Sequence, residues 1–243
     1  MPGPRAVILA GGKGTRLRPY TTVLPKPLMP VGERPILDIV LRQLKHAGFE
    51  RVTISTGYLA ELIEAFFGDG SKIGIPVDYV REDEPLGTAG ALGLVDRLDD
   101  NFLVMNGDVL TDMDYGALLK EHSGSDAAAT IATQRRDIQV SLGVLRFGDE
   151  ADGTRLTGYD EKPTLSYEAS MGVYCFAPRA LEEINAGEHL DFPDLVLRLI
   201  AAGEVVRGRP TEAFWLDIGR HDDYEQAQED FERLADRFLP HGT

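Results

Sequence analysis

The residues best suited to chemistry lie within the first thirty positions of the chain. A short apolar run at residues 6–10 leads into the segment GGKGTRLRP at residues 11–19. This order is typical of a buried strand followed by a glycine loop, whose backbone N–H groups can approach an anion closely. Lys13, Arg16 and Arg18 add positive charge at the same place. The segment therefore predicts a binding loop for a polyphosphate.

The glycine spacing separates this loop from two better-known phosphate loops. A P-loop needs the pattern G-x-x-x-x-G-K-[ST], which is absent, and a dinucleotide loop needs a third glycine where Leu17 stands. A second motif follows, in which Pro25 and Pro27 flank Lys26 and stiffen the backbone on both sides of it. We therefore expect Lys26 to be held in one position.

Two further motifs place an aspartate directly after an apolar run: Asn-Gly-Asp at residues 106–108 and Trp-Leu-Asp-Ile-Gly at residues 215–219. A carboxylate at a strand tip can hold a hard cation, and Mg²⁺ prefers one or two carboxylates plus substrate phosphates and water. Asp108 and Asp217 are therefore the predicted Mg²⁺ ligands. The alternatives are that Asp108 forms a turn and that Asp217 caps a helix beginning near Arg220.

In this order, the motifs resemble those of the sugar-1-phosphate nucleotidylyltransferases over roughly residues 5–230. The resemblance implies transfer of a nucleoside monophosphate from a triphosphate to a sugar 1-phosphate, with release of pyrophosphate and no side-chain nucleophile. It implies that Arg16, Lys26, Asp108 and Lys162 carry the catalysis by positioning and neutralising charge. The nucleotide-binding residues expected in the first two motifs are Leu9, Ala10, Gly11, Gly12, Gly14, Thr15, Arg16 and Lys26.

The sugar side is expected from a later motif, Glu161-Lys162-Pro163. By resemblance, Glu161 accepts hydrogen bonds from sugar hydroxyls and Lys162 neutralises the sugar phosphate, while Gly143 and Gly172 give backbone contacts to the sugar. Ser170-Met171-Gly172 departs from the Asn-Ala-Gly common in the family, which leaves the sugar undetermined. The alternative for Glu161 and Lys162 is a surface turn with an adjacent ion pair.

Base selection is expected at Gly87 and Thr88, within Leu-Gly-Thr-Ala-Gly. This segment looks most like that of guanylyltransferases acting on mannose 1-phosphate, so GTP is the expected triphosphate; thymidylyl and other transfers of the same fold are alternatives. Thr88 could instead cap a helix. The alternatives from other classes are a non-catalytic nucleotide or sugar-phosphate sensor and an NAD-dependent oxidoreductase, which Leu17 disfavours.

Composition restricts the partners. The net charge of −15 disfavours nucleic acid and anionic membranes. The single cysteine, Cys175, lies in an apolar run, which rules out a disulfide framework and favours the cytoplasm. The expected partners are a nucleoside triphosphate and a sugar 1-phosphate, and a homo-oligomer is compatible with the sequence.

Strands and helices alternate from residue 6 to residue 122, and mainly strands follow from residue 127 before helices resume. This pattern predicts an α/β fold: a Rossmann-like three-layer αβα sandwich with a mixed, mostly parallel central sheet, whose second half completes the sheet and builds a sugar pocket. Residues 1–243 are expected to form one nucleotidyltransferase domain. The C-terminal left-handed β-helix of some family members is expected to be absent, because the chain stops after a helix near Phe238.

Overall fold

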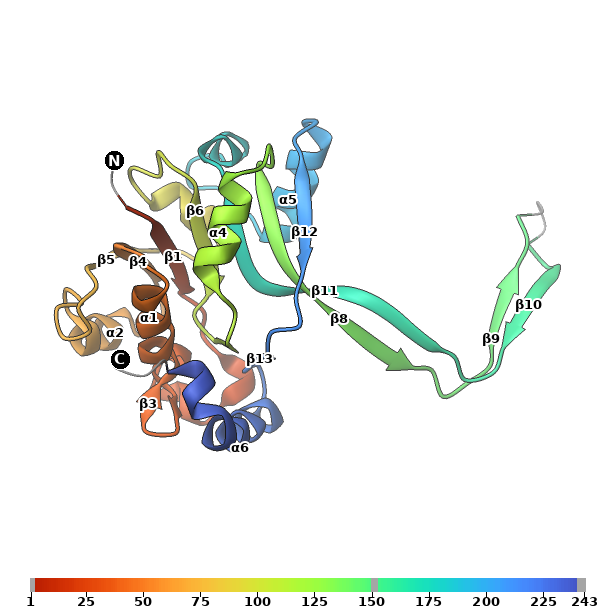
Figure 1. Cartoon of the computed structure of the whole chain (residues 1–243), viewed down its shortest axis with the longest axis horizontal. Coiled ribbons are helices and arrows are strands. Elements are labelled where there is room, and N and C mark those ends of the chain that lie inside the picture. Colours follow the sequence, from red (N-terminus) through yellow and green to blue (C-terminus); the bar gives the residue numbers. More distant parts are fainter. Residues whose placement is uncertain (1–2, 150–152, 240–243) are drawn as a thin grey trace.

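The computed structural model describes residues 3–149 and 153–239. A seven-stranded mixed sheet with the order β12-β8-β11-β6-β1-β4-β5 crosses the body of the molecule (Figure 1). Its parallel part consists of β1 (Arg5–Ala10), β4 (Arg51–Thr56), β5 (Val77–Arg81) and β6 (Phe102–Asn106). The helices between these strands are α1 (Ile36–His46), α2 (Ala60–Phe67) and α3 (Gly87–Gly90).

The second half of the chain completes the same sheet, as predicted. β11 (Thr164–Phe176) runs antiparallel to both β6 and β8 (Ala129–Gln139), and β12 (Val206–Pro210) runs parallel to β8. Three helices belong to this half or lead into it: α4 (Tyr115–Ser123), α5 (Phe192–Ala201) and α6 (His221–Phe238).

Short elements complete the fold. Three small pairs of strands lie outside the main sheet: β2 (Pro30–Val31) with β3 (Arg34–Pro35), β7 (Val109–Thr111) with β13 (Trp215–Asp217), and β9 (Val144–Phe147) with β10 (Leu156–Asp160). Single 3₁₀ turns are η1 (Thr15–Leu17), η2 (Tyr20–Thr22), η3 (Lys26–Leu28), η4 (Ala91–Leu94) and η5 (Pro178–Glu183).

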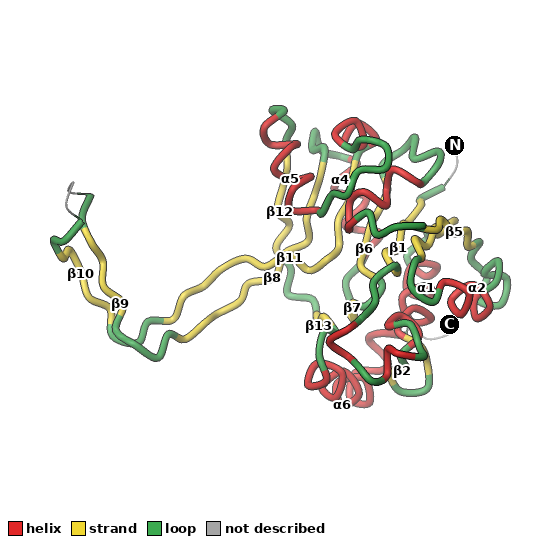
Figure 2. Tube along the Cα trace, turned by 180° about the vertical axis from the view of Figure 1, so that it is seen from behind, coloured by secondary structure: helices red, strands yellow, loops and turns green. Residues whose placement is uncertain are grey.

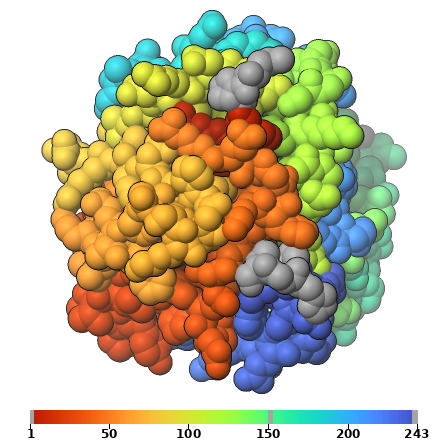
Figure 3. All heavy atoms as spheres, turned by 60° about the vertical axis from the view of Figure 1, so that its left-hand side comes forward, coloured from red at the N-terminus to blue at the C-terminus, as the bar shows by residue number. Residues whose placement is uncertain are grey.

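The sheet is covered on both faces, because successive side chains of its strands point to opposite sides. Ile8 of β1 belongs to a core shared with α1, α2 and α4, whereas its neighbour Val7 belongs to a core shared with η4 and α5. This arrangement confirms the three-layer α/β prediction. α6 packs over a third apolar cluster beside α1 and η1. The first half of the chain, red to yellow, forms most of the face seen in Figure 3.

Two elements differ from the sequence expectation. Within the predicted alternation, the helix after β5 is split into α3 and η4 and ends at Leu94, because glycines at positions 87, 90 and 93 favour helix weakly. The second half also forms an arm that the sequence did not predict: β8 and β11 leave the body as a two-stranded ribbon with β9 and β10 at its tip (Figures 1 and 2).

Within the described residues, no helix is both long and apolar enough to cross a membrane. Cys175 is fully buried in the sheet, and this burial raises the pKa of its thiol. The thiol is therefore packed as a small apolar side chain, as its place in the sequence predicts.

His122 of α4 should make folding stability dependent on pH. Its ring is buried, Nδ1 lies 2.8 Å from Thr130 Oγ1, and burial together with the Arg179 charge holds the pKa of His122 below its ordinary value of 6.5. The unfolded chain therefore binds a proton that the folded one does not, and stability falls as the pH drops below 6.5. We expect the free energy of unfolding, measured with denaturant between pH 5 and 7.5, to depend less on pH in His122→Gln than in the wild type. The slope of that free energy against pH should be smaller by at most about 1.4 kcal/mol per pH unit. The exposed His46 gives the control: His46→Gln should keep the wild-type slope.

Candidate active site

A pocket of about 270 Å³ lies where β1 and β6 end. Eight of the predicted residues line it, together with Pro27 and Gly107: Leu9, Ala10, Gly12, Gly14, Thr15, Arg16, Lys26 and Asp108. The glycine loop, the proline-flanked lysine and the first aspartate thus meet at the carboxyl ends of parallel strands, where open α/β sheets bind ligands.

The glycine loop is held open by its own turn. Gly14 adopts a left-handed backbone with φ of 58°, and its carbonyl accepts hydrogen bonds from the Leu17 N–H at 2.9 Å and the Thr21 hydroxyl at 2.8 Å. A side chain at Gly14 would be strained at this φ and would meet Thr21 at 2.9 Å. Leu17 is buried beneath the turn. Leu17, which stands where a dinucleotide loop would have its third glycine, is therefore part of the apolar core.

The two aspartates are brought together by the antiparallel pairing of β7 and β13. Asp217 pairs with Val109, the residue after Asp108, and the Ile218 N–H donates to the Asp108 carbonyl at 3.2 Å. Asp217 does not cap α6. The Arg220 N–H instead donates to Asp223 at 2.7 Å, so the helix-cap alternative is wrong.

Lys26 lies between the two carboxylates. It is 8% exposed, its ammonium group is ion-paired with Asp108 Oδ2, and it lies 4.0 Å from Asp217 Oδ1. The position of Lys26 is fixed by η3, as its flanking prolines predict. Partial burial and the neighbouring Asp108 charge raise the pKa of Asp217, and Lys26 and Arg16 oppose that rise.

The carboxylates fit a divalent cation. Asp108 Oδ1 is buried and has no hydrogen-bond partner, which leaves one oxygen free for a ligand. Two carboxylates that repel each other across a short gap are the donor set that Mg²⁺ uses when phosphates and water fill its remaining positions. No group of three or more His, Cys, Asp or Glu side chains gathers in the described part of the chain, so those remaining positions would need to come from a ligand.

Arg16 is placed by the second aspartate motif. Its guanidinium lies against Gly219, where an added Cβ would be 3.3 Å from Nη1. Arg16 is otherwise exposed at the mouth of the pocket, whereas Arg18 does not line it. The arginine therefore presents its charge to a ligand on the loop side.

Gly11 lies behind the pocket. Its carbonyl accepts the Tyr58 N–H at 3.3 Å, and an added Cβ would lie 2.6 Å from Glu82 Oε1. Glu82 accepts hydrogen bonds from Ser55 at 2.8 Å and from the Leu86 N–H at 3.1 Å, and so anchors the segment before α3. Sequence reasoning missed Glu82, because no motif marks it.

The segment predicted to select the base packs against α5. Asp191 accepts hydrogen bonds from the Thr88 N–H at 2.9 Å and the Thr88 hydroxyl at 3.2 Å. The same hydroxyl accepts the Phe192 N–H at 2.9 Å, so Thr88 caps α5 rather than its own helix. The role of Gly87 and Thr88 in base recognition stays a prediction.

The predicted sugar residues are divided between the body and the arm. Gly172 is buried beside Asn106, and its φ of 71° and a 2.7 Å approach to Asn106 Nδ2 leave no room for a side chain. Gly143, Glu161 and Lys162 lie on the arm, where Tyr159 packs over Gly143 and donates to Glu161 at 3.2 Å. The structure therefore does not bring Lys162 to the pocket of its own chain, and its role stays a prediction.

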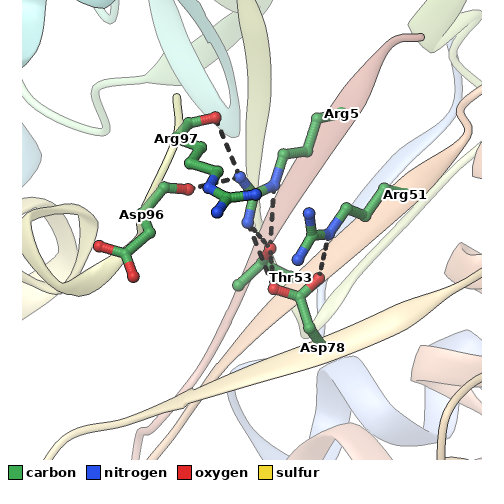
Figure 4. Close-up of polar contacts among 6 residues, drawn as sticks. All are labelled: Arg5, Arg51, Thr53, Asp78, Asp96 and Arg97. Carbon is green, nitrogen blue, oxygen red and sulfur yellow. Dashed lines mark hydrogen bonds and ion pairs between the residues drawn. The ribbon is translucent and has the colours of Figure 1, made fainter. Parts of the chain in front are cut away.

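A separate hollow of about 800 Å³ lies at the opposite ends of the strands, where β1 and β4 begin. Figure 4 shows Arg5 and Arg51 converging there on Asp78, at 3.3 and 2.8 Å, while Arg5 also reaches Thr53 and the carbonyl groups of Asp96 and Arg97. These two guanidinium groups tie the strand starts together. The pocket with Lys26 and Asp108 lies at the other end of the sheet, where β1 and β6 end.

The sequence of the chain matches the model of a known protein family. The model of a family described as nucleotidyl transferase matches residues 5–233, nearly the whole chain. The chain belongs to the nucleotidyl transferase family. This membership confirms the resemblance drawn from the loop and aspartate motifs, and the fold agrees with it.

Relatives within the family differ in the nucleotide that they are named for. The chain is 35% identical to a UTP–glucose-1-phosphate uridylyltransferase of Synechocystis over 92% of its length and 62% of the relative's. It is 33% identical to a mannose-1-phosphate guanylyltransferase of Mycobacterium tuberculosis, over 94% and 64% of the two chains. It thus spans less than two thirds of these relatives.

Solved structures agree in fold. A putative glucose-1-phosphate thymidylyltransferase from Bacillus anthracis, in complex with sucrose, superimposes with a TM-score of 0.74 and 26% identity, covering 93% of this chain and 94% of that one. HddC from Yersinia pseudotuberculosis, complexed with GMP-PN, gives a TM-score of 0.71 and 27% identity, covering 94% and 99%.

Asp108→Asn should abolish cation-dependent ligand binding with little loss of stability, because it removes a charge while keeping the shape of the side chain. We expect the rise in Tm given by Mg²⁺ with GTP to disappear, and any turnover to fall on the order of 10²-fold or more. Asp112→Asn is the control. It lies on the same segment but pairs with Arg237 and the Phe214 N–H, so it should lower Tm and keep the Mg²⁺ response. A normal Mg²⁺ response in Asp108→Asn would contradict the metal assignment.

Proposed function

We propose that this chain transfers a nucleoside monophosphate from a nucleoside triphosphate to a sugar 1-phosphate. The observation that carries the proposal is the meeting of a glycine loop, Arg16, Lys26 and two carboxylates at one pocket. Such a set can neutralise a triphosphate and a divalent cation without providing a nucleophile. Two relatives are named as a uridylyltransferase and a guanylyltransferase of a sugar 1-phosphate, and these names support the same reaction.

In the proposed reaction an oxygen of the sugar phosphate attacks the α-phosphorus. The bond from that phosphorus to the bridging oxygen of the β-phosphate breaks, and its electron pair leaves with pyrophosphate. The glycine loop and Arg16 would hold the departing pyrophosphate, and Lys26 would neutralise the reacting phosphates. Mg²⁺, held by Asp108 and Asp217, would supply further charge neutralisation when bound.

GTP is the proposed triphosphate, and a mannose 1-phosphate or related sugar the proposed acceptor. The support is the Leu-Gly-Thr-Ala-Gly segment and the guanylyltransferase names among the relatives. Uridylyl and thymidylyl names also occur, so the choice of base is the finer part of the proposal.

A matrix of nucleoside triphosphates against sugar 1-phosphates, read by pyrophosphate release, tests the reaction and the base together. We expect the highest kcat/KM with GTP and a sugar 1-phosphate of the manno series, and no release without sugar phosphate. Preference for UTP or dTTP would overturn the guanine assignment alone. A chain that binds nucleotide and sugar phosphate but releases no pyrophosphate with any pair would favour the sensor.

Arg16→Ala should weaken triphosphate binding, because a guanidinium group that neutralises phosphate is removed from the pocket mouth. Calorimetry with GTP and Mg²⁺ should show a loss of roughly tenfold or more, equal to about 1.4 kcal/mol, while the affinity for sugar 1-phosphate changes less. Arg18→Ala, two residues along the same loop and outside the pocket, is the matched control. Equal losses in both variants would mean that general loop charge, rather than Arg16, binds the triphosphate.

A further inference from the structure

The arm, residues 134–169, exposes an unusual share of apolar surface. Half of the exposed large apolar side chains in the described residues lie on it, including Leu142 at 72% and Tyr159 at 63% exposure. The full set on the arm is Ile138, Leu142, Leu145, Phe147, Leu156, Tyr159, Leu165 and Tyr167. A two-stranded hairpin without a covered face is marginal in water.

The apolar side chains of the ribbon lie on one face. Ile138 stands directly opposite Leu165, and Tyr167 follows Leu165 on the same side, since alternate residues of a strand share a face. The other face is polar and internally bonded: Ser166 donates to Asp137 at 2.6 Å and accepts from Arg135 at 2.9 Å. The ribbon is therefore amphipathic, which is typical of a strand pair whose apolar face packs against another element.

The tip repeats this arrangement. Leu145 stands opposite Tyr159, and Phe147 opposite Leu156, on one face of the β9–β10 hairpin. The opposite face carries the Arg146–Asp160 ion pair at 2.8 Å. Both parts of the arm thus present an apolar side that the body of the same chain leaves uncovered (Figures 1 and 2).

The arm also carries Lys162 away from its own pocket. The ladder of β8 and β11 is continuous from the Ser170–Thr133 pair to the Thr164–Gln139 pair, which is seven residue pairs and a length of about 20 Å. Lys162 lies beyond the far end of this ladder. Meanwhile the pocket is lined by only two cations, Arg16 and Lys26, both on the loop side. None of the residues that line this pocket comes from the arm.

We propose that the arm packs on a second copy of this chain and delivers Lys162 to that copy's pocket. The inference rests on the proposed function, because it gives Lys162 the sugar phosphate as its target. Only a second copy has the pocket that Lys162 would complete, and a two-fold dimer satisfies both arms and both pockets at once.

The surfaces involved are of the right size. The apolar side chains of one arm expose on the order of 1,000 Å², and a stable interface buries roughly 1,200–2,000 Å² over both partners. The body offers exposed apolar side chains next to the glycine loop, Tyr20 at 53% and Val23 at 74%. Both residues lie in the segment between the glycine loop and Lys26, and they offer an apolar seat for an incoming arm.

Mass measurement in solution tests the packing. We expect a dimer by light scattering at micromolar concentrations, converted to monomer by Ile138→Asp on the apolar face. Gln139→Asp, its neighbour on the polar face, is the matched control and should stay dimeric. A wild-type monomer, or equal behaviour of the two variants, overturns the proposal.

Cross-linking tests the contact without any activity assay. One tagged chain carries Lys162→Cys and another carries Asp217→Cys, and the native Cys175 is buried and unreactive. A short thiol cross-linker should give a covalent pair of the two chains. If no such pair forms, the arm does not reach the partner's pocket, and the proposal fails whatever the reaction is.

Reciprocal heterodimers, isolated by two tags, test completion of the site. Exchange of arms predicts about half of the wild-type turnover when one chain carries Asp108→Asn and the other Lys162→Ala, because one pocket is then intact. It predicts almost none when a single chain carries both changes beside a wild-type chain. The reverse pattern overturns the proposal. A wild type without turnover overturns the proposed function, and the cross-link then decides the arm alone.

Discussion

The site depends on one short antiparallel pairing, that of β7 with β13. It joins residues more than a hundred positions apart and places two carboxylates at one edge of a pocket, with Lys26 between them. Partial burial, and after it the neighbouring Asp108 charge, raise the pKa of Asp217. The lysine offsets part of the repulsion, and a cation bound with phosphate would offset the rest. The pairing therefore holds two carboxylates and one lysine together, the set on which the proposed binding of a phosphate with its cation depends.

The same pairing extends to the root of the arm. Trp215 of β13 donates its indole N–H to the Met171 carbonyl at 2.8 Å, and the Arg136 guanidinium lies 4.9 Å above the Trp215 ring. Strand β13 thus holds Asp217 at the pocket and, two residues earlier, fixes the point where β8 and β11 leave the body. One tryptophan therefore connects the position of Asp217 to the direction of the arm.

The sequence predicted the parts of the fold that depend on local patterns. The apolar run at residues 6–10 predicted a strand, and β1 ends at Ala10 as that run does. The glycine and proline motifs marked the loop and Lys26, because glycine frees the backbone and proline restricts it. Asp108 and Asp217 were predicted as a pair because each follows an apolar run, and the family resemblance pointed to the same two residues. Spacing alone says nothing of two positions so far apart, so only the sheet pairing explains why they meet.

The arm and Glu82 could not be predicted, for different physical reasons. Glu82 acts through hydrogen bonds to Ser55 and the Leu86 N–H, which leave no periodic trace in the sequence. The second half was predicted to be mainly strands, but the extension of β8 and β11 into a ribbon that leaves the body was not predicted. Alternation of apolar and polar residues indicates only that one face of a strand is covered. The alternation does not show which element covers that face. A strand pair that packs on its own chain and one that packs on another chain therefore have the same sequence pattern.

A bulge at the root of the arm links the direction of the arm to the position of the residues near Asp108. Between the Thr133–Ser170 and Ile131–Tyr174 pairs, three residues of β11 oppose only Ala132 of β8. Such a bulge bends a strand and increases its twist. Gly172, in the middle of it, takes a left-handed φ and packs on Asn106, two residues before Asp108. A side chain at this position would disturb both the pocket floor and the departure of the arm, so one glycine couples the nucleotide end of the site to the residues that carry Lys162.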